Sequence, residues 1–297
     1  MNFGANEVAE LREKTGCGMM DCKKALTEAN GNMVRAIEVL RERGVAVAAK
    51  KAGRIAAEGI VAAITKPNVG VLIEINSETD FVAKNQQFIE FSKACAEVVA
   101  TENPANISAL LTCNLGEKTV EEELKEKILV IGENLKIRRF ARFEGTTRSY
   151  IHGDGRIGVL VLFNPTNQSS DFEELAKDIA MQIAAHNPSW LARTDVAQKT
   201  LEKERQILTA QVVSEGKPEN IAQKIVDGRI EKYYKENCLM EQEFIKNPDL
   251  NVSEYIDSIS KKINQQINIV QFTRFERGEG LQKKEDNFAN EVAEMLN

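Results

Sequence analysis

The sequence of 297 residues contains few of the side chains that most often carry out covalent chemistry. It has two histidines, His152 and His186, and neither stands at a spacing that would bind a metal ion. No serine or cysteine lies in a recognisable nucleophile motif, so a structural role is expected for both histidines ahead of a catalytic one. We therefore expect a protein that acts by binding and that has no metal or cofactor.

The five cysteines are too scattered for a disulfide framework. Cys17 and Cys22 are close together, but no second cysteine pair or histidine cluster would complete a zinc site. Free thiols in a reducing compartment are the better interpretation. The first residues show no basic-then-apolar signal pattern, and no apolar run approaches membrane-spanning length, so we expect a cytoplasmic protein.

Phosphate-binding motifs are also missing, since the sequence has no G-x-x-x-x-G-K-[ST] string. One string, GDGRIG from Gly153 to Gly158, does satisfy G-x-G-x-x-G. A dinucleotide-binding motif of that kind follows a strand and opens a helix. Here the glycines precede the strand-like run VLVLF, where they would provide the positive φ angles of a hairpin turn. We interpret the string as a turn, which argues against a nucleotide-dependent enzyme.

The net charge of −6 argues against a general nucleic-acid or membrane surface. Met1–Arg54 carries ten Lys and Arg against seven Asp and Glu, whereas Ile55–Ser189 carries thirteen against nineteen. A mildly basic head beside an acidic middle is more typical of docking between proteins. We therefore expect no direct contact with nucleic acid or membrane.

The hydrophobic pattern changes its period along the chain, which predicts an α+β protein. The first residues contain three helical runs that are separated at Gly16 and Gly31 and end at Gly44. The next part predicts a hairpin around Lys66-Pro67-Asn68, an amphipathic helix in NQQFIEFSKACAEVVA, a second helix from Val120 to Asn134 and a strand in LKIRRFARFEG.

The same plan then repeats, so the core is predicted to be pseudo-duplicated. The string GVL at Gly70 recurs at Gly158, and RF at Arg142 recurs at Arg274. The two RF strings are farther apart in the sequence than the two GVL strings, because two long helical runs interrupt the second copy. These runs predict a projecting helical hairpin. The predicted parts are a three-helix domain (1–54), a first core subdomain (55–146), a second core subdomain (147–189 and 250–278), an inserted helical hairpin (190–249) and a C-terminal helical module (279–297).

The stretch SETDFVAKN follows the most strand-like run of the sequence and places Asp80 next to Phe81. Thr79 or Asp80 could cap a helix, and Phe81 lies seven residues before Phe88, in phase with a core face. Asn85 is also a ready cap for the helix that carries Phe88, so the pair could instead lie ahead of that helix in a loop. Pattern alone leaves Phe81 open as a buried anchor or an exposed probe.

Longer strings carry a specific resemblance. LREKTGCGMMDCKKALTEANGN, AAKKAGRIAAEG, INSETDFVAKN, YIHGDGRIGVLV and RFERGEG occur in this order from Leu11 onward. Together they resemble the bacterial translation elongation factor Ts family over essentially the whole chain. The resemblance implies a ubiquitin-associated-like head, a core of two related subdomains and an inserted hairpin that the family calls a dimerisation domain. Use of that hairpin varies among members, so the resemblance leaves a homodimer open.

The resemblance also implies the activity of a guanine-nucleotide exchange factor rather than an enzyme of covalent chemistry. Its partner would be elongation factor Tu, bound both with GDP and without nucleotide, and held until GTP binds. The family's T-D-F-V motif matches Thr79, Asp80, Phe81 and Val82, and it would bring Asp80 and Phe81 to the Mg²⁺ and phosphate site of the GTPase. Other positions that match family contacts with the partner are Arg12, Met19, Met20, Lys23, Ile131 and His152.

Each of these contacts has a competing interpretation. Met19 and Met20 could fill the core of the head, and His152 could be a turn histidine with its bonds satisfied within the chain. The competing class for the whole protein is an adaptor that binds others without changing them. An adaptor has no need of an exposed aromatic side chain directly after a strand, so the exposure of Phe81 separates the two classes.

Overall fold

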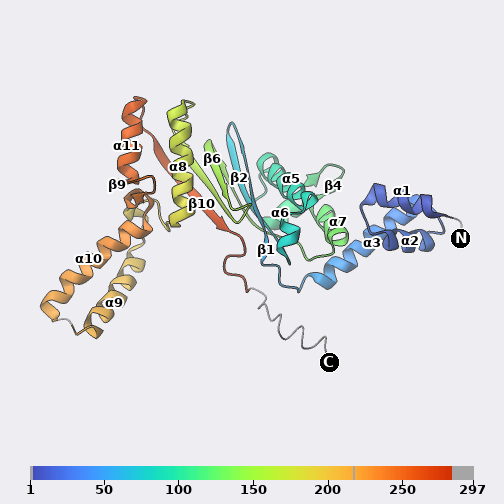
Figure 1. Cartoon of the computed structure of the whole chain (residues 1–297), viewed down its shortest axis with the longest axis horizontal. Coiled ribbons are helices and arrows are strands. Elements are labelled where there is room, and N and C mark those ends of the chain that lie inside the picture. The colour runs from blue at the N-terminus through green and yellow to red at the C-terminus, as the bar shows by residue number, and fades with distance from the viewer. Residues whose placement is uncertain (1–2, 217, 283–297) are drawn as a thin grey trace.

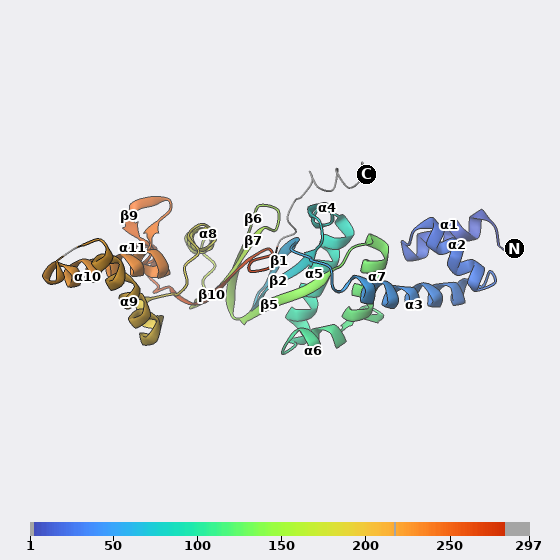
Figure 2. The ribbon, with the colours of Figure 1, turned by 90° about the horizontal axis from the view of Figure 1, so that it is seen from below.

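The computed structural model describes residues 3–216 and 218–282, and Figure 1 shows an elongated arrangement of helices around small antiparallel sheets. A helical head lies at one end, the strands form the middle, and a helical hairpin projects at the other end (Figures 1 and 2). The predicted α+β class is confirmed. Of the predicted C-terminal helical module (279–297), the part from 283 onward, which contains the amphipathic string EDNFANEVAEML, lies outside the described residues.

The head consists of α1 (Ala5–Thr15), α2 (Met19–Glu28) and α3 (Met33–Lys51). Leu11, Cys22 and Leu26 are fully buried between these helices. The prediction that Gly44 ends the third helix is wrong, because α3 continues to Lys51.

Gly44 has a packing role instead. It is buried against α7 (Val120–Ile131), where an added Cβ atom would lie 3.5 Å from the carbonyl oxygen of Lys125. The glycine allows α3 to lie close to α7, which fixes the head on the first core subdomain.

The first sheet has the order β1-β2-β5, with β1 (Glu58–Lys66), β2 (Val69–Ser77) and β5 (Lys136–Glu144) antiparallel. Pro67 and Asn68 form the predicted turn, since Lys66 pairs with Val69. Helix α5 (Gln86–Glu102) covers one face of this sheet through Phe88, Phe91 and Cys95.

The first subdomain also contains short elements that the sequence pattern did not reveal. These are α4 (Asp80–Ala83), α6 (Ile107–Thr112), β3 (Asn114–Leu115) and β4 (Lys118–Thr119). Helix α7 begins at a capping box formed by Thr119 and Glu122, and it ends at Gly132 rather than at the predicted Asn134 because Gly132 adopts a positive φ of 84°.

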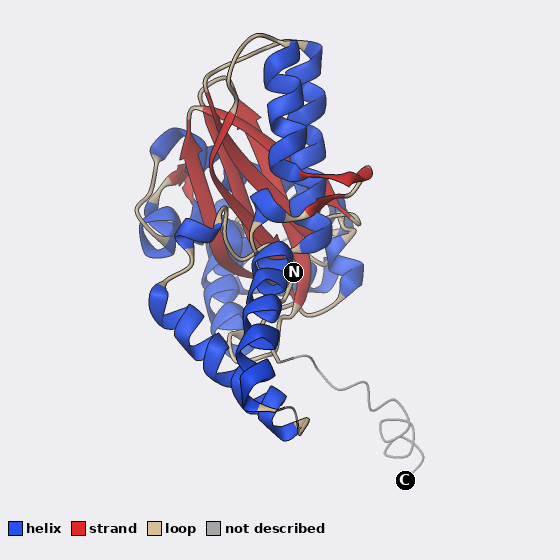
Figure 3. Cartoon of the chain, turned by 90° about the vertical axis from the view of Figure 1, so that its left-hand side faces the viewer, coloured by secondary structure: helices blue, strands red, loops and turns tan. Residues whose placement is uncertain are grey.

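The second sheet repeats the plan with the order β10-β7-β6. Its strands are β6 (Thr146–His152), β7 (Ile157–Asn164) and β10 (Asn268–Glu276), and α8 (Ser170–His186) packs on it. In both sheets the second strand of a hairpin lies in the middle and pairs with a strand that returns later in the chain. Figure 3 shows the strands in the middle of the molecule, with helices on the outside.

The repeated glycines Gly70 and Gly158 lie where the two sheets pack together. A Cβ atom added at Gly70 would come within 2.5 Å of the Thr147 hydroxyl oxygen, and one at Gly158 within 2.4 Å of a methyl group of Val61. Both distances are shorter than real contacts, so only glycine permits this close approach. The recurring GVL string therefore marks the contact between the two subdomains.

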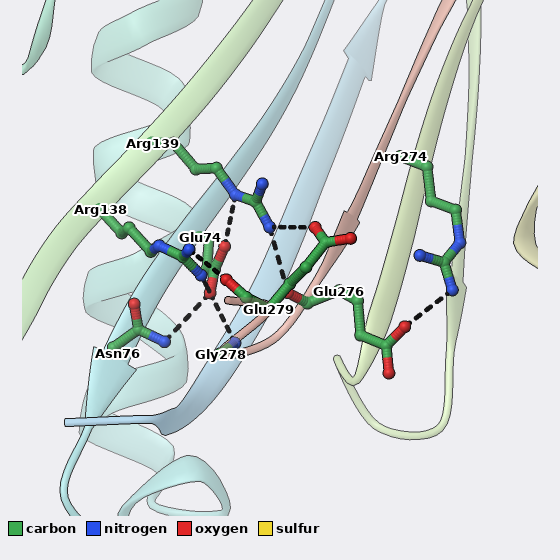
Figure 4. Close-up of polar contacts among 8 residues, drawn as sticks. All are labelled: Glu74, Asn76, Arg138, Arg139, Arg274, Glu276, Gly278 and Glu279. Atoms are coloured by element: carbon green, nitrogen blue, oxygen red, sulfur yellow. Dashed lines mark hydrogen bonds and ion pairs between the residues drawn. The ribbon is translucent and has the colours of Figure 1, made fainter. Parts of the chain in front are cut away.

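A buried carboxylate joins the same two subdomains on the first sheet. Glu74 of β2 is 0% exposed and accepts hydrogen bonds from Arg138 (2.9 Å), Arg139 (2.6 Å) and the backbone N–H of Gly278 (2.8 Å) (Figure 4). Asn76 donates a further bond at 3.1 Å. Burial alone raises the pKa of Glu74, but the Gly278 amide, Asn76 and the two guanidinium groups together hold that pKa below its ordinary value.

The predicted hairpin consists of α9 (Gln198–Ser214) and α10 (Glu219–Asn237), which pack on each other through Val212, Val226 and Ile230. Single 3-10 turns, Arg193–Asp195 and Leu239–Glu241, flank it at its base. The chain then forms β8 (Glu243–Phe244), β9 (Asn247–Asn251) and α11 (Val252–Lys262), which were not predicted. Within the described ranges, no helix is both long and apolar enough to cross a membrane.

Candidate partner-binding site

Phe81 lies on the short helix α4 and is 79% exposed, more than any other large hydrophobic side chain in the part of the chain that the structure describes. The competing interpretation, in which Phe81 is a buried anchor in phase with Phe88, is therefore wrong. That phase requires one continuous helix, but the chain leaves helical structure at Lys84, and Asn85 starts α5 by accepting from the N–H groups of Gln87 and Phe88.

The four residues of the T-D-F-V motif divide into two outward and two inward side chains. Val82 is 7% exposed and packs in the same core as Phe88. Thr79 points toward Glu133, whose carboxylate accepts from its backbone N–H at 3.0 Å and from its hydroxyl at 2.6 Å. Asp80 and Phe81 are thus presented to solvent by two neighbours that are held in place.

Asp80 is the only acid of the motif, and its partner within the described chain is Lys84 at 3.2 Å. Both side chains are at least half exposed. An exposed ion pair of this kind contributes roughly 0–1 kcal/mol. The carboxylate can therefore exchange Lys84 for another cation at little cost.

Ile131 lies at the end of α7 and lines a hollow beside Phe81. The hollow has a volume of about 470 Å³ and is open to solvent. It is lined by Phe81, Val82, Asn85, Gln86, Gln87, Val130 and Ile131. The structure thus brings Ile131, predicted from a distant part of the sequence, next to the exposed aromatic ring.

The head presents its predicted contact residues outward. Met19 is 53% exposed and Met20 is 61% exposed, and Arg12 and Lys23 are exposed as well. The competing interpretation, in which the methionines fill the core, is wrong. Two adjacent exposed methionines form an adaptable apolar surface.

His152 ends β6 and is exposed, with its Nδ1 atom 3.1 Å from the Tyr150 hydroxyl oxygen. The turn that follows has positive φ at Gly153, Asp154 and Gly155, and it precedes β7. The GDGRIG string is therefore a hairpin turn, as predicted. The context that a dinucleotide-binding motif needs does not occur there.

That turn lies against the first subdomain, close to α4. The backbone N–H of Val61 donates to the carbonyl of Gly155 at 2.8 Å. A mostly apolar hollow of about 420 Å³ opens between this turn, β1 and α4. Its walls include Ile60, Ala62, Ala83, Lys84, Ile89, Lys93, Ile151 and Asp154. Residues of α4 therefore line both hollows, Phe81 and Val82 the first and Ala83 the second.

The cysteines do not form a reactive or metal-binding group. All five are free, and four of them, Cys17, Cys22, Cys95 and Cys238, are buried. Burial raises the pKa of the Cys95 thiol and brings that of Cys238 to about 11, which disfavours the thiolate. Among residues 3–216 and 218–282 no group of three or more His, Cys, Asp or Glu could hold a metal ion.

Sequence reasoning missed Glu133, Glu78 and Asn134. Glu133 contacts Thr79 across 54 residues of sequence, and Glu78 accepts from the backbone N–H of Asn134 at 2.7 Å. No local pattern pairs residues so far apart. The strings that carry the resemblance include Glu78 but not Glu133 or Asn134, so they do not reveal this pairing either.

Comparison with known proteins agrees with the resemblance. Residues 78–279 match the family model described as Elongation factor TS. The chain is 53% identical over 297 residues to "Elongation factor Ts" of Clostridium perfringens (strain SM101 / Type A), with 98% of each chain covered. It is 48% identical over 300 residues to "Elongation factor Ts" of Clostridium botulinum (strain Alaska E43 / Type E3), with 99% of each covered.

Proposed function

The chain belongs to the elongation factor Ts family, and we propose that it is a guanine-nucleotide exchange factor that promotes GDP release from elongation factor Tu during translation elongation. The observation that supports this best is Phe81, an aromatic side chain that is 79% exposed on a helix whose neighbouring residues are fixed. A cytoplasmic location follows from the proposed role.

In the proposed mechanism, Asp80 and Phe81 enter the GTPase near its Mg²⁺ and phosphate site. GDP is held there by a phosphate-binding loop and by a Mg²⁺ ion that neutralises phosphate charge. An inserted aromatic ring repacks the elements that hold the ion, and the carboxylate of Asp80 competes for cationic and hydrogen-bonding groups around it. Both effects weaken the binding of GDP while no covalent bond is made or broken.

Exchange is then a coupling of two binding equilibria. If the factor lowers the affinity of the GTPase for GDP by a given ratio, GDP lowers the affinity of the GTPase for the factor by the same ratio. The factor must therefore bind the nucleotide-free GTPase more tightly than the GDP-bound form. It stays bound until GTP enters, and GTP then expels it by the same reciprocity.

The remaining matched residues extend the proposed contact beyond Asp80 and Phe81. Arg12, Met19, Met20 and Lys23 of the head would dock on the partner, and Ile131 and His152 of the core would contact it as well. Five of them are exposed, and Ile131 is half-buried but lines the open hollow beside Phe81, which supports this assignment. A broad contact of this kind supplies the affinity, which leaves Asp80 and Phe81 free to act on the nucleotide site.

The projecting hairpin is the element that we propose for any self-association. Ile207, Val213 and Ile221 on it are exposed apolar residues. Light scattering of the wild type and of a variant with all three replaced by serine tests this: a dimer should become a monomer. A dimer that survives these substitutions would place the interface elsewhere.

The exchange activity is tested by loading elongation factor Tu with a fluorescent GDP analogue and mixing it with unlabelled nucleotide in a stopped-flow instrument. Catalytic amounts of this protein should accelerate release of the analogue. An adaptor would bind the GTPase and leave the release rate unchanged, so that result would reject the proposed function in favour of the adaptor class.

A further inference from the structure

Two loops that are distant in sequence hold each other through a pair of carboxylates. Glu133 accepts from the backbone N–H and the hydroxyl of Thr79, at 3.0 and 2.6 Å. In return, Glu78 accepts from the backbone N–H of Asn134 at 2.7 Å. Each loop therefore satisfies a backbone donor of the other, and we refer to Glu78, Thr79, Glu133 and Asn134 as the carboxylate clasp.

The clasp determines where α4 begins. This helix has four residues, and a helix so short is not stable without outside support. Thr79 occupies its N-cap position, but the Thr79 side chain makes no capping hydrogen bond there. Its hydroxyl donates to Glu133 instead, and its carbonyl accepts from the Ser77 hydroxyl at 2.9 Å.

Phe81 lies two residues beyond the clasp and directly before buried Val82. Its backbone is thus held on both sides, by Glu133 through Thr79 and by the core through Val82 and Ala83. The backbone that carries the exposed aromatic ring is therefore ordered before it meets a partner. Ordering it beforehand reduces the entropy that is lost on binding.

The head is fastened to the same loop. The Lys51 ammonium, at the end of α3, donates to the carbonyl of Gly132. The Asn134 side chain donates to the carbonyl of Arg54 at 2.8 Å, and the Arg54 guanidinium lies 3.4 Å from Glu78. The loop after α7 therefore fixes the chain that leaves the head and the chain that carries Phe81 relative to each other.

We propose that Glu133 is a positioning residue for nucleotide exchange: it holds Thr79, and through Thr79 it sets the position from which Phe81 enters the partner. This inference rests on the proposed function and deepens it. Glu133 does not itself reach the nucleotide site. Its effect is to keep a four-residue turn in the one conformation that inserts productively.

A positioning role and a merely structural role differ in what they change. If Glu133 only stabilised the fold, its removal would lower the melting temperature and leave the exchange rate of the folded protein intact. If it positions Phe81, its removal lowers the maximal rate of GDP release at saturating factor. The concentration for half-maximal rate changes less, because the head still docks.

The test uses the full chain with Glu133→Ala, Glu133→Gln and a control, Glu102→Ala, which removes an exposed carboxylate at the far end of α5. We expect the Thr79 amide of Glu133→Ala to exchange with deuterium at least about tenfold faster in the free protein. Its maximal GDP release rate should fall about tenfold, which corresponds to about 1.4 kcal/mol. Glu133→Gln should recover part of the amide protection and part of the release rate, since glutamine keeps one of the two acceptor oxygens to which Thr79 donates. Glu102→Ala should behave as wild type.

Three results would overturn the inference, and they are distinct. An unchanged deuterium-exchange rate of the Thr79 amide in Glu133→Ala shows that the carboxylate does not hold the loop. A deprotected amide with an unchanged maximal release rate shows that Phe81 needs no positioning. If Glu133→Ala does not fold, Glu133→Gln decides through the same two measurements. A wild-type protein that fails to accelerate release at all rejects the proposed function and the positioning role with it, whatever the amide shows.

Discussion

Phe81 and Val82 are adjacent in the chain, yet Phe81 is 79% exposed whereas Val82 is 7% exposed. A four-residue helix turns one side chain to solvent and the next into the core. The buried Val82 anchors the backbone of Phe81, so the aromatic ring is carried on a fixed backbone without being part of the hydrophobic core. This separation predicts that function and stability respond to different residues of one motif.

Phe81→Ala should slow GDP release strongly and leave stability almost unchanged. Substitution of an exposed side chain usually changes the free energy of unfolding by about 0.5 kcal/mol or less. The matched control is Phe88→Ala, which removes a fully buried ring and should cost about 3–5 kcal/mol. Thermal melting and stopped-flow release of the two variants check this, and a melting temperature that falls equally in both would contradict the exposure of Phe81.

Asp80→Asn should also slow exchange while preserving the fold. The Asp80–Lys84 ion pair spans 3.2 Å between exposed side chains, so its loss changes the free energy of unfolding by roughly 0–1 kcal/mol. Lys84→Gln breaks the same pair from the other side and keeps the carboxylate. If the ion pair is incidental, Lys84→Gln retains the release rate that Asp80→Asn loses. An equal loss of release rate in Asp80→Asn and Lys84→Gln would assign the effect to the ion pair itself.

The two exposed methionines of the head should contribute to affinity. The double variant Met19→Gln, Met20→Gln keeps the length of both side chains and makes them polar, and burying an apolar side chain of this size is worth about 1.5–3 kcal/mol. We expect its Kd for nucleotide-free elongation factor Tu to rise tenfold or more, measured by calorimetry. The control is Val34→Gln, which changes an apolar residue on α3 that is also exposed and lies outside the predicted contact. Similar losses for both would show that any apolar residue of the head suffices.

Local features of the fold were predictable where sequence neighbours determine them. The turn at Gly153-Asp154-Gly155 and the cap at Asn85 were predicted because turn chemistry and capping depend on residues that are close in sequence. The end of α3 was mispredicted because Gly44 is selected by contact with α7, which the local pattern does not contain. Helix α11 was missed, although its capping box of Asn251 and Glu254 was a usable signal.

The candidate site divides in the same way. The motif itself could be found in the sequence, but the direction of Phe81 could not, since a seven-residue spacing to Phe88 indicates a shared face only in an unbroken helix. The bond between Thr79 and Glu133 depends on how α7 ends beside β2, which is a property of the folded chain. The long-range contacts that hold a functional residue in place are thus harder to predict from the sequence than the identity of the residue itself.

Gly158→Ala should destabilise the contact between the two sheets. The added methyl group would lie 2.4 Å from Val61 Cγ1 and 2.8 Å from Leu72 Cδ1, and overpacking of this kind costs typically about 1–3 kcal/mol. The matched control is Gly228→Ala in the middle of α10, where no atom lies within 4 Å of the added Cβ. That substitution should stabilise the protein by about 0.5–1 kcal/mol, because alanine favours a helix over glycine. Chemical denaturation of both variants checks the opposite signs, and destabilisation by Gly228→Ala would contradict the open surroundings of α10.

Glu74→Gln should lower stability at neutral pH and lower it less in acid. The buried carboxylate accepts from Arg138, Arg139 and the Gly278 amide, and loss of such charge-assisted bonds costs about 2 kcal/mol. The folded protein lowers the pKa of Glu74 from 4.5, so the unfolded chain takes up the proton first as the pH falls. The contribution of the carboxylate is therefore complete above about pH 5 and is lost as the pH falls from 4.5 through the lower pKa of the folded state.

The measurement is the difference in unfolding free energy between wild type and Glu74→Gln at a series of pH values. That difference should be largest near neutrality and should shrink in acid. Glu102→Gln supplies the control for an exposed carboxylate, and it should show a small difference at every pH. Other carboxylates with lowered pKa, such as Glu173 and Glu276, destabilise both proteins equally in acid and cancel in the comparison. A difference that stays constant across the series would mean that Glu74 keeps the same protonation in the folded and unfolded states, and the ionised Glu74 that accepts from the Gly278 amide would have to be abandoned.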